Sequence, residues 1–200
     1  MKKRKITILA FLLFAGVNSI NAQDKDNKWA LSFGVNAVDA STAGLSDIGA
    51  MASDYFSTDD WNVLPAISTI AVSRYMNYGL SVKVSGSLNK IQYVREKNDS
   101  EGLSFSSVDA AAVYDLNSLF GDTGWFDPHV QAGLGSAWID DTSSLTVNAG
   151  WGFNSWFNEN VGLSFDSTYN YANGGFNGDN EVAGYFQHSL GLIIRFNGDE

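Results

Sequence analysis

The sequence predicts an all-β fold, an eight-stranded antiparallel up-and-down transmembrane β-barrel that follows an N-terminal signal peptide. The first observation is that apolar and polar residues alternate with period two in one run after another. The second is that one face of these runs is small and polar, as in a narrow lumen whose outer wall meets lipid. The third is the composition: 20 Gly, 2 Pro and 14% aromatic residues suit strands around a crowded concave surface.

Residues 1–22 have the pattern of a Sec signal peptide. A basic start precedes an apolar run from Ile6 to Val17, and the small residue Ala22 stands at the expected cleavage site. The alternative, a membrane-anchoring helix, is disfavoured because the run is too short to cross a bilayer. We therefore expect one mature domain, the barrel, in residues 23–200.

Charge and cysteine content exclude several classes of protein. The net charge is −10 and becomes −14 without the signal peptide, because residues 1–22 hold four cations and no acid. A mature chain with so few basic residues and no basic run is not expected to bind nucleic acid. The sequence has no Cys, so stability must come from backbone pairing and packing rather than disulfides, and no lipoprotein acylation site follows the signal.

Eight runs have about the length that a tilted membrane strand needs. The expected strands are residues 28–38, 63–76, 80–89, 103–116, 128–139, 145–157, 161–171 and 184–196.

In the first four runs an apolar face opposes a small or polar one, except in the second run, where both faces are mixed. The second run opens near Pro65, a placement that strands tolerate close to their start, and closes at the turn signal of residues 77–79. The expected outward residues of the other three are Trp29, Leu31, Phe33 and Val35, then Leu80, Val82, Val84 and Leu88, then Val108, Ala110, Ala112 and Tyr114.

The last four runs alternate more regularly. Their expected outward residues are Val130, Ala132, Leu134 and Trp138; Val147, Ala149, Trp151 and Phe153; Leu163, Phe165, Tyr169 and Tyr171; and Phe186, Leu190, Leu192, Ile194 and Phe196. On the inner faces, the pairs Gly133/Gly135 and Gly150/Gly152 open no helix and so are not nucleotide loops. We interpret them as lumen positions where a side chain would not fit.

The connections alternate in length, which predicts an orientation. If the chain enters from the periplasm, residues 39–62, 90–103, 140–144 and 172–183 lie outside, and 77–79, 117–127 and 158–160 lie in the periplasm. Long outer loops and short periplasmic turns are typical of outer-membrane barrels. The periplasmic connection 117–127 is long for its class, and the outer connection 140–144 is short.

The alternation also predicts a cluster of charges in the lumen. Isolated charges there would be costly, so we expect paired acids and bases that plug an eight-stranded barrel already narrow enough to be filled by side chains. The predicted members are Arg74, Lys83, Asp109, Asp115, Asp166 and Arg195, with Lys83 beside Arg74 and Asp115. An ion-conducting or gated pore is the alternative.

Aromatic residues lie near the strand ends, where an amphipathic ring is stable at the level of the lipid headgroups. We predict interfacial girdles made of Trp29, Tyr75, Tyr114, Trp125, Trp138, Trp151, Tyr169 and Phe196. A stacking platform for sugars or bases is disfavoured, since the rings are spread over all the strands.

The sequence offers little for catalysis, cofactors or metals, and we expect none of the three. His129 and His188 are the only histidines and lie on separate strands. Small outer-membrane barrels that cut lipids combine His, Ser and an acid. Pairing of His188 with Ser167 is conceivable, whereas Ser189, its neighbour in the strand, points to the other face. The Asp, Asn and Gly of 173–181 lack the spacing of a calcium loop.

Several segments of the chain resemble the β-barrel domain of the OmpA family, in the form common in Bacteroidetes. They are Trp61-Asn62-Val63-Leu64-Pro65, Ser73-Arg74-Tyr75, Ser85-Gly86-Ser87-Leu88-Asn89-Lys90-Ile91, Gly124-Trp125-Phe126-Asp127-Pro128 and Tyr185-Phe186-Gln187-His188-Ser189-Leu190-Gly191. The resemblance implies a barrel in the outer membrane of a Gram-negative bacterium. It commonly implies a following peptidoglycan-binding domain as well. This sequence stops after the last strand, as a stand-alone barrel or a fragment.

From these observations we expect an integral outer-membrane barrel with a structural or surface-interaction role and no catalysis. The alternatives are a narrow solute or ion pore and a lipid-modifying enzyme. The expected partners are outer-membrane lipid and the insertion machinery, through the aromatic-ended strand at Arg195-Phe196. A surface ligand is not identified, and peptidoglycan would be a partner only through a domain beyond Glu200.

Overall fold

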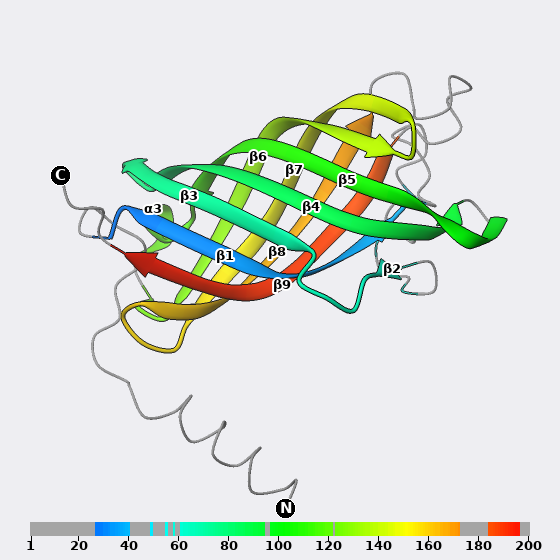
Figure 1. Ribbon diagram of the computed structural model, residues 1–200. Helices are drawn as coiled ribbons and strands as arrows, with labels where there is room; N and C mark the ends of the chain where they lie inside the picture. The colour runs from blue at the N-terminus through cyan, green and yellow to red at the C-terminus, as the bar shows by residue number, and fades with distance from the viewer. Residues whose placement is uncertain are drawn as a thin grey trace, which may run out of the picture.

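The described chain closes into an eight-stranded antiparallel barrel, as the sequence predicts. Its sheet has the order β2-β1-β3-β4-β5-β6-β7-β8-β9, and β1 also pairs with β9, which closes the ring and leaves β2 as a short extra strand (Figure 1). Among the described residues no helix is long and apolar enough to span a membrane. The computed structural model describes residues 27–40, 61–94, 97–121, 123–172 and 184–196 and the single residues Gly49, Tyr55 and Thr58.

β1 pairs antiparallel with β3, and from β3 to β9 each strand pairs antiparallel with the next in the chain, so the barrel is up-and-down. The strands are β1 Trp29–Asp39, β2 Asn62–Val63, β3 Thr69–Asn77, β4 Leu80–Val94, β5 Lys97–Asp115, β6 Phe126–Ile139, β7 Thr142–Trp156, β8 Val161–Ala172 and β9 Gly184–Phe196. The predicted signal peptide, residues 1–22, lies outside the described residues, as does most of the connections 39–62 and 172–183.

The predicted second strand, residues 63–76, is two elements in the structure. β2 pairs with the end of β1, and β3 begins only at Thr69. Pro65 lies in a bend between them, because a residue without an N–H cannot continue the ladder. The side chain of Asn62 holds β2 in place: its Nδ2 donates to Val38 O at 3.0 Å and its Oδ1 accepts from Gln92 N at 2.6 Å.

The predicted outer connection 90–103 is largely strand. Pairing between β4 and β5 continues through Ile91 and Leu103 to Val94 and Lys97, so the hairpin projects well beyond the rim (Figure 1). We call the end of the barrel where β1 starts and β9 ends the near end, and the opposite end the far end. The hairpin projects from the far end. A charged composition made this segment look like a loop, but the backbone pairing of a hairpin does not require apolar side chains.

The other connections are tight turns or one short helix. At the near end, Tyr78 and Gly79 adopt left-handed φ angles of 50° and 77°, and helix α3, Asn117–Phe120, lies within the connection 117–127. At the far end, Asp140 lies between β6 and β7 and accepts hydrogen bonds from the backbone N and hydroxyl of Ser104, both at 2.8 Å. These hydrogen bonds hold the pKa of the Asp140 carboxyl below its usual range.

The lumen is layered along the barrel axis. An apolar cluster closes the far end, and a smaller one at the near end consists of Ala30, Trp156 and Ile193. Between them the inward positions are mainly polar. The far cluster contains Val38, Ala40, Ile91, Phe105, Ala137, Ile139, Ala172 and Tyr185.

The backbones of β1 and β9 approach each other closely at the seam where the two strands close the barrel, and this close approach can be tested. Gly34 faces Gly191 across this seam, and a methyl group on Gly34 would collide with the Leu190 carbonyl oxygen. We expect Gly34→Ala to lower the stability of the folded barrel by about 1–3 kcal/mol, the usual cost of overpacking. The measurement is the temperature at which the folded band converts to the unfolded band on a gel.

The matched control is Gly86→Ala in β4, where the nearest atom to the added methyl would be Ser107 O at 3.9 Å. Equal conversion temperatures for the two variants would contradict the close approach at the seam.

Candidate functional site

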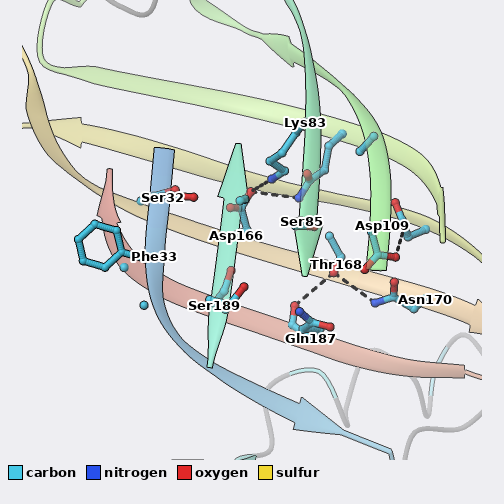
Figure 2. A pocket seen from close by; sticks show the side chains of 18 residues that line it. Ser32, Phe33, Lys83, Ser85, Asp109, Asp166, Thr168, Asn170, Gln187 and Ser189 are labelled. Carbon is cyan, nitrogen blue, oxygen red and sulfur yellow. Dashed lines mark hydrogen bonds and ion pairs between the residues drawn. The ribbon is translucent and has the colours of Figure 1, made fainter. Parts of the chain in front are cut away.

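The middle of the lumen is crossed by an ion pair between opposite walls. Lys83 on β4 reaches Asp166 on β8, with Nζ 2.8 Å from Oδ1 (Figure 2). Two groups from β6 meet the same oxygen: His129 Nε2 at 3.0 Å and Gln131 Nε2, which donates at 3.1 Å. The two charged side chains are 14% and 17% exposed, so this pair is largely removed from bulk water.

Two cavities of about 50 Å³ each lie on either side of the ion pair. Lys83 and Asp166 line both, so the pair forms the partition between them. The upper cavity, toward the far end, is also lined by Asp109 and Gln187 (Figure 2). Each cavity has polar walls and a volume sufficient for a few water molecules.

The remaining inward acids are satisfied by neutral donors. Asp109 accepts from Ser107 Oγ at 3.2 Å and from Asn148 Nδ2 at 3.0 Å. Asp115, at the near end, accepts from the backbone N of Asn117 at 2.9 Å and lines the lower cavity.

Glycines make room for this network. A methyl group on Gly135 would collide with the Asp109 carboxylate, and one on Gly152 would lie 2.6 Å from His129 Nε2. The expectation that these glycines mark crowded lumen positions is therefore met at both residues.

At the near end, a second group of contacts surrounds Trp156. Its Nε1 donates to Asp127, whose other oxygen accepts from Asn117 Nδ2 at 3.0 Å. The Arg195 guanidinium lies over the Trp156 ring, 4.3 Å from the centroid, and its Nε donates to the Glu159 carbonyl oxygen. Arg195 is 1% exposed, and its contacts include the face of the Trp156 ring and the Glu159 carbonyl oxygen.

Arg74 corrects the predicted lumen cluster, because it lies on the outer wall. It is exposed, and its guanidinium lies 5.2 Å from the Trp29 ring centroid. The reason is that the odd-numbered residues of β3, Thr69, Ala71 and Ser73, point inward, so the even-numbered Arg74 points outward. The expected neighbours of Lys83 also differ, since Lys83 is opposite Ala111 on β5, whereas Asp115 is opposite His129.

Tyr75 corrects the predicted aromatic girdles for the same reason. Its side chain lines the lower cavity, and its hydroxyl accepts from Gly79 N at 3.3 Å. The other predicted members of the girdles lie on the outer side, as shown by the alternation of side chains along their strands or by the exposure of their own side chains. They are Trp29, Tyr114, Trp125, Trp138, Trp151, Tyr169 and Phe196. Their interfacial role remains a prediction.

Sequence reasoning missed two groups. Alternation with the outward residues Val130 and Ala132 places His129 and Gln131 on the inner face, but it gives them no partner, because the partner depends on the stagger of strands across the barrel. It also left open whether Ser167 and His188 meet, and in the structure they are direct cross-strand partners. Within the described residues, no three His, Cys, Asp or Glu side chains gather as a metal site would require.

Comparison with known proteins finds similarity in fold but none in sequence family. No family model and no curated protein matches the sequence. Solved structures that match are the N-terminal β-barrel domain of OprF from Pseudomonas aeruginosa (15% identity, TM-score 0.53, 86% of this chain and 98% of that one) and Neisserial surface protein A (19%, 0.56, 84% and 97%). The outer membrane protein OprG from Pseudomonas aeruginosa also matches (11%, 0.52, 90% and 99%).

At these identities the likeness is one of fold. The chain has the same eight-stranded barrel fold as these outer-membrane proteins.

The ion pair predicts a specific pattern of stability. Asp166→Asn removes the carboxylate that pairs directly with the Lys83 ammonium, so we expect a loss of roughly 3 kcal/mol, the low end for breaking a buried pair, because some exposure remains. The double variant Lys83→Met/Asp166→Asn should recover most of that loss. Unfolding in denaturant from lipid vesicles measures both. A double variant no more stable than the single one would contradict the pairing.

Proposed function

We propose that this protein is an integral barrel of the outer membrane of a Gram-negative bacterium, a relative of the OmpA family, with a structural or surface-interaction role. Support comes first from the outer wall. Large apolar side chains at successive outward positions are exposed, among them Val84, Leu134 and Leu145 at 52%, 66% and 70%. A continuous apolar surface of this kind marks contact with lipid or a partner rather than with water.

The observation that carries the non-conducting role is that the lumen is blocked at three levels, by the Lys83–Asp166 pair between the two cavities and by an apolar cluster at each end. A path for ions along the axis would have to break this pair and its contacts with His129 and Gln131. It would also have to pass the apolar clusters at both ends. The lumen is therefore proposed to be a packed core that holds the wall rigid.

A surface-interaction role is supported by the extended β4–β5 hairpin. In the proposed orientation the far end faces the outside, and the paired residues Val94 and Lys97 stand beyond the rim. β5 pairs with β6 only as far as Phe105, so the projecting part of β5 has no partner strand on that side among the described residues. A strand edge without a partner can pair with a ligand, whose identity the hairpin does not specify.

Other partners follow from the same proposal. Outer-membrane lipid would surround the wall, and the insertion machinery would recognise the last strand through Phe196. Peptidoglycan would be bound only if the natural protein continues into a cell-wall domain.

Conductance measurements distinguish the sealed barrel from its main alternative. The purified protein in a planar lipid bilayer should give no steady channel current, with a porin measured in parallel to show that channels are detected. The Lys83→Met/Asp166→Asn variant should also be silent, because the apolar clusters remain. Stepwise currents from the native protein would instead support a narrow pore. The observation that favours a narrow pore is that the two cavities are separated from each other by the Lys83–Asp166 pair and the side chains in contact with it.

Lipid exposure of the wall is tested at Val84. Replacing this outward residue by Arg should destabilise the barrel in vesicles by about 2–4 kcal/mol if it lies near the bilayer midplane. Val84→Leu, the matched control, should change the free energy of unfolding little. Equal stability of the two variants would show that the residue does not face lipid.

A further inference from the structure

The outer wall carries a buried polar pair, Ser167 on β8 and His188 on β9. Both point outward, because their chain neighbours Asp166, Thr168 and Gln187 line the upper cavity. They are opposite each other in the ladder, and Ser167 Oγ lies 2.9 Å from His188 Nδ1. A hydroxyl hydrogen-bonded to an imidazole is the arrangement that activates a serine nucleophile.

Two aromatic residues cover the pair on the side that would otherwise meet lipid. Tyr55 places its hydroxyl 2.8 Å from Ser167 Oγ, and the Trp61 ring is stacked on the His188 ring with centroids 4.6 Å apart. Ser167 is consequently 2% exposed and His188 6% exposed. The imidazole is held by rings rather than by a carboxylate, and its Nε2 has no hydrogen-bond partner among the described residues.

The position of the pair along the wall indicates its substrate class. On β8 the next two outward residues toward the far end are Tyr169 and Tyr171, the ring type that lies at lipid headgroups. Ser167 is therefore placed just inside the headgroup level, where the ester bonds of membrane lipids lie. This placement rests on the membrane location proposed above.

We propose that Ser167 and His188 form a nucleophile and general base that hydrolyse an ester bond of a membrane lipid. The ester must displace the Tyr55 hydroxyl to reach Ser167. Ser167 Oγ then bonds to the ester carbonyl carbon while its proton passes to His188 Nδ1. The bond from that carbon to the lipid alcohol breaks, and the alcohol leaves with the proton from His188.

Water completes the reaction. It loses a proton to His188 as its oxygen bonds to the acyl carbon, the bond to Ser167 Oγ breaks, and Ser167 regains the proton. The products are a fatty acid and the lipid alcohol, with no oxidant or other co-reactant. The Tyr55 hydroxyl hydrogen-bonds Ser167 in the resting state and keeps water from it.

The first test uses a fluorophosphonate probe on the full chain folded in lipid vesicles, with the labelled peptide identified by mass spectrometry. We expect the label on Ser167, and a labelling rate about 100-fold lower in His188→Gln, the low end for loss of a general base. Tyr55→Ala should label faster than the native protein. Ser143→Ala, which removes an exposed outward serine on β7 opposite Trp138, is the matched control and should label normally.

The second test measures fatty acid released from phosphatidylethanolamine vesicles, which should be lost in Ser167→Ala. A folded, vesicle-inserted protein that labels at Ser167 in neither the native form nor Tyr55→Ala overturns the proposal, as does labelling without release of fatty acid. Failure to insert into vesicles would instead count against the membrane location, so the two proposals fail separately.

Discussion

The narrowness of an eight-stranded lumen is the constraint on which the rest of this structure depends. Every inward side chain must be small or must find a partner across the axis, because polar groups left alone there would be costly. Lys83 and Asp166 meet this requirement from opposite walls, and the glycines at 135 and 152 yield the space that their neighbours occupy. Packing in the lumen thereby replaces the single apolar core that a water-soluble domain would have.

Alternation along the chain was sufficient to predict the fold class and the direction of most side chains. Because successive residues of a strand point to opposite faces, the inner positions of Lys83, Asp109 and Asp166 followed from parity alone. Parity failed at Arg74 and Tyr75, since both faces of that segment are mixed and Pro65 interrupts it. The predicted strand from residue 63 is interrupted, and β3 begins at Thr69. Which of its residues point inward therefore cannot be counted from residue 63.

Partners inside the barrel could not be predicted in this way. The partner of Lys83 is three strands further round than the adjacent strand that holds Asp115, and it is set by the stagger of strands around the ring, which no local pattern encodes. The Ser167–His188 pair was within reach, because both are outward by parity and β8 and β9 are consecutive. To predict this pair, one would need to know the register in which β8 pairs with β9. The sequence does not determine that register, because the connection 172–183 between the two strands is long.

The central claim is that the folded lumen is closed to solutes, and the absence of native cysteine allows a direct measurement. Single cysteines introduced as Ser85→Cys in the upper cavity and Ser73→Cys in the lower cavity would each be unique thiols. A membrane-impermeant thiol reagent is added to barrels inserted in vesicles, and modification is followed by mass spectrometry. The account predicts that both thiols stay unmodified until the barrel is unfolded. Rapid modification of both in the folded protein would show an open lumen and contradict it.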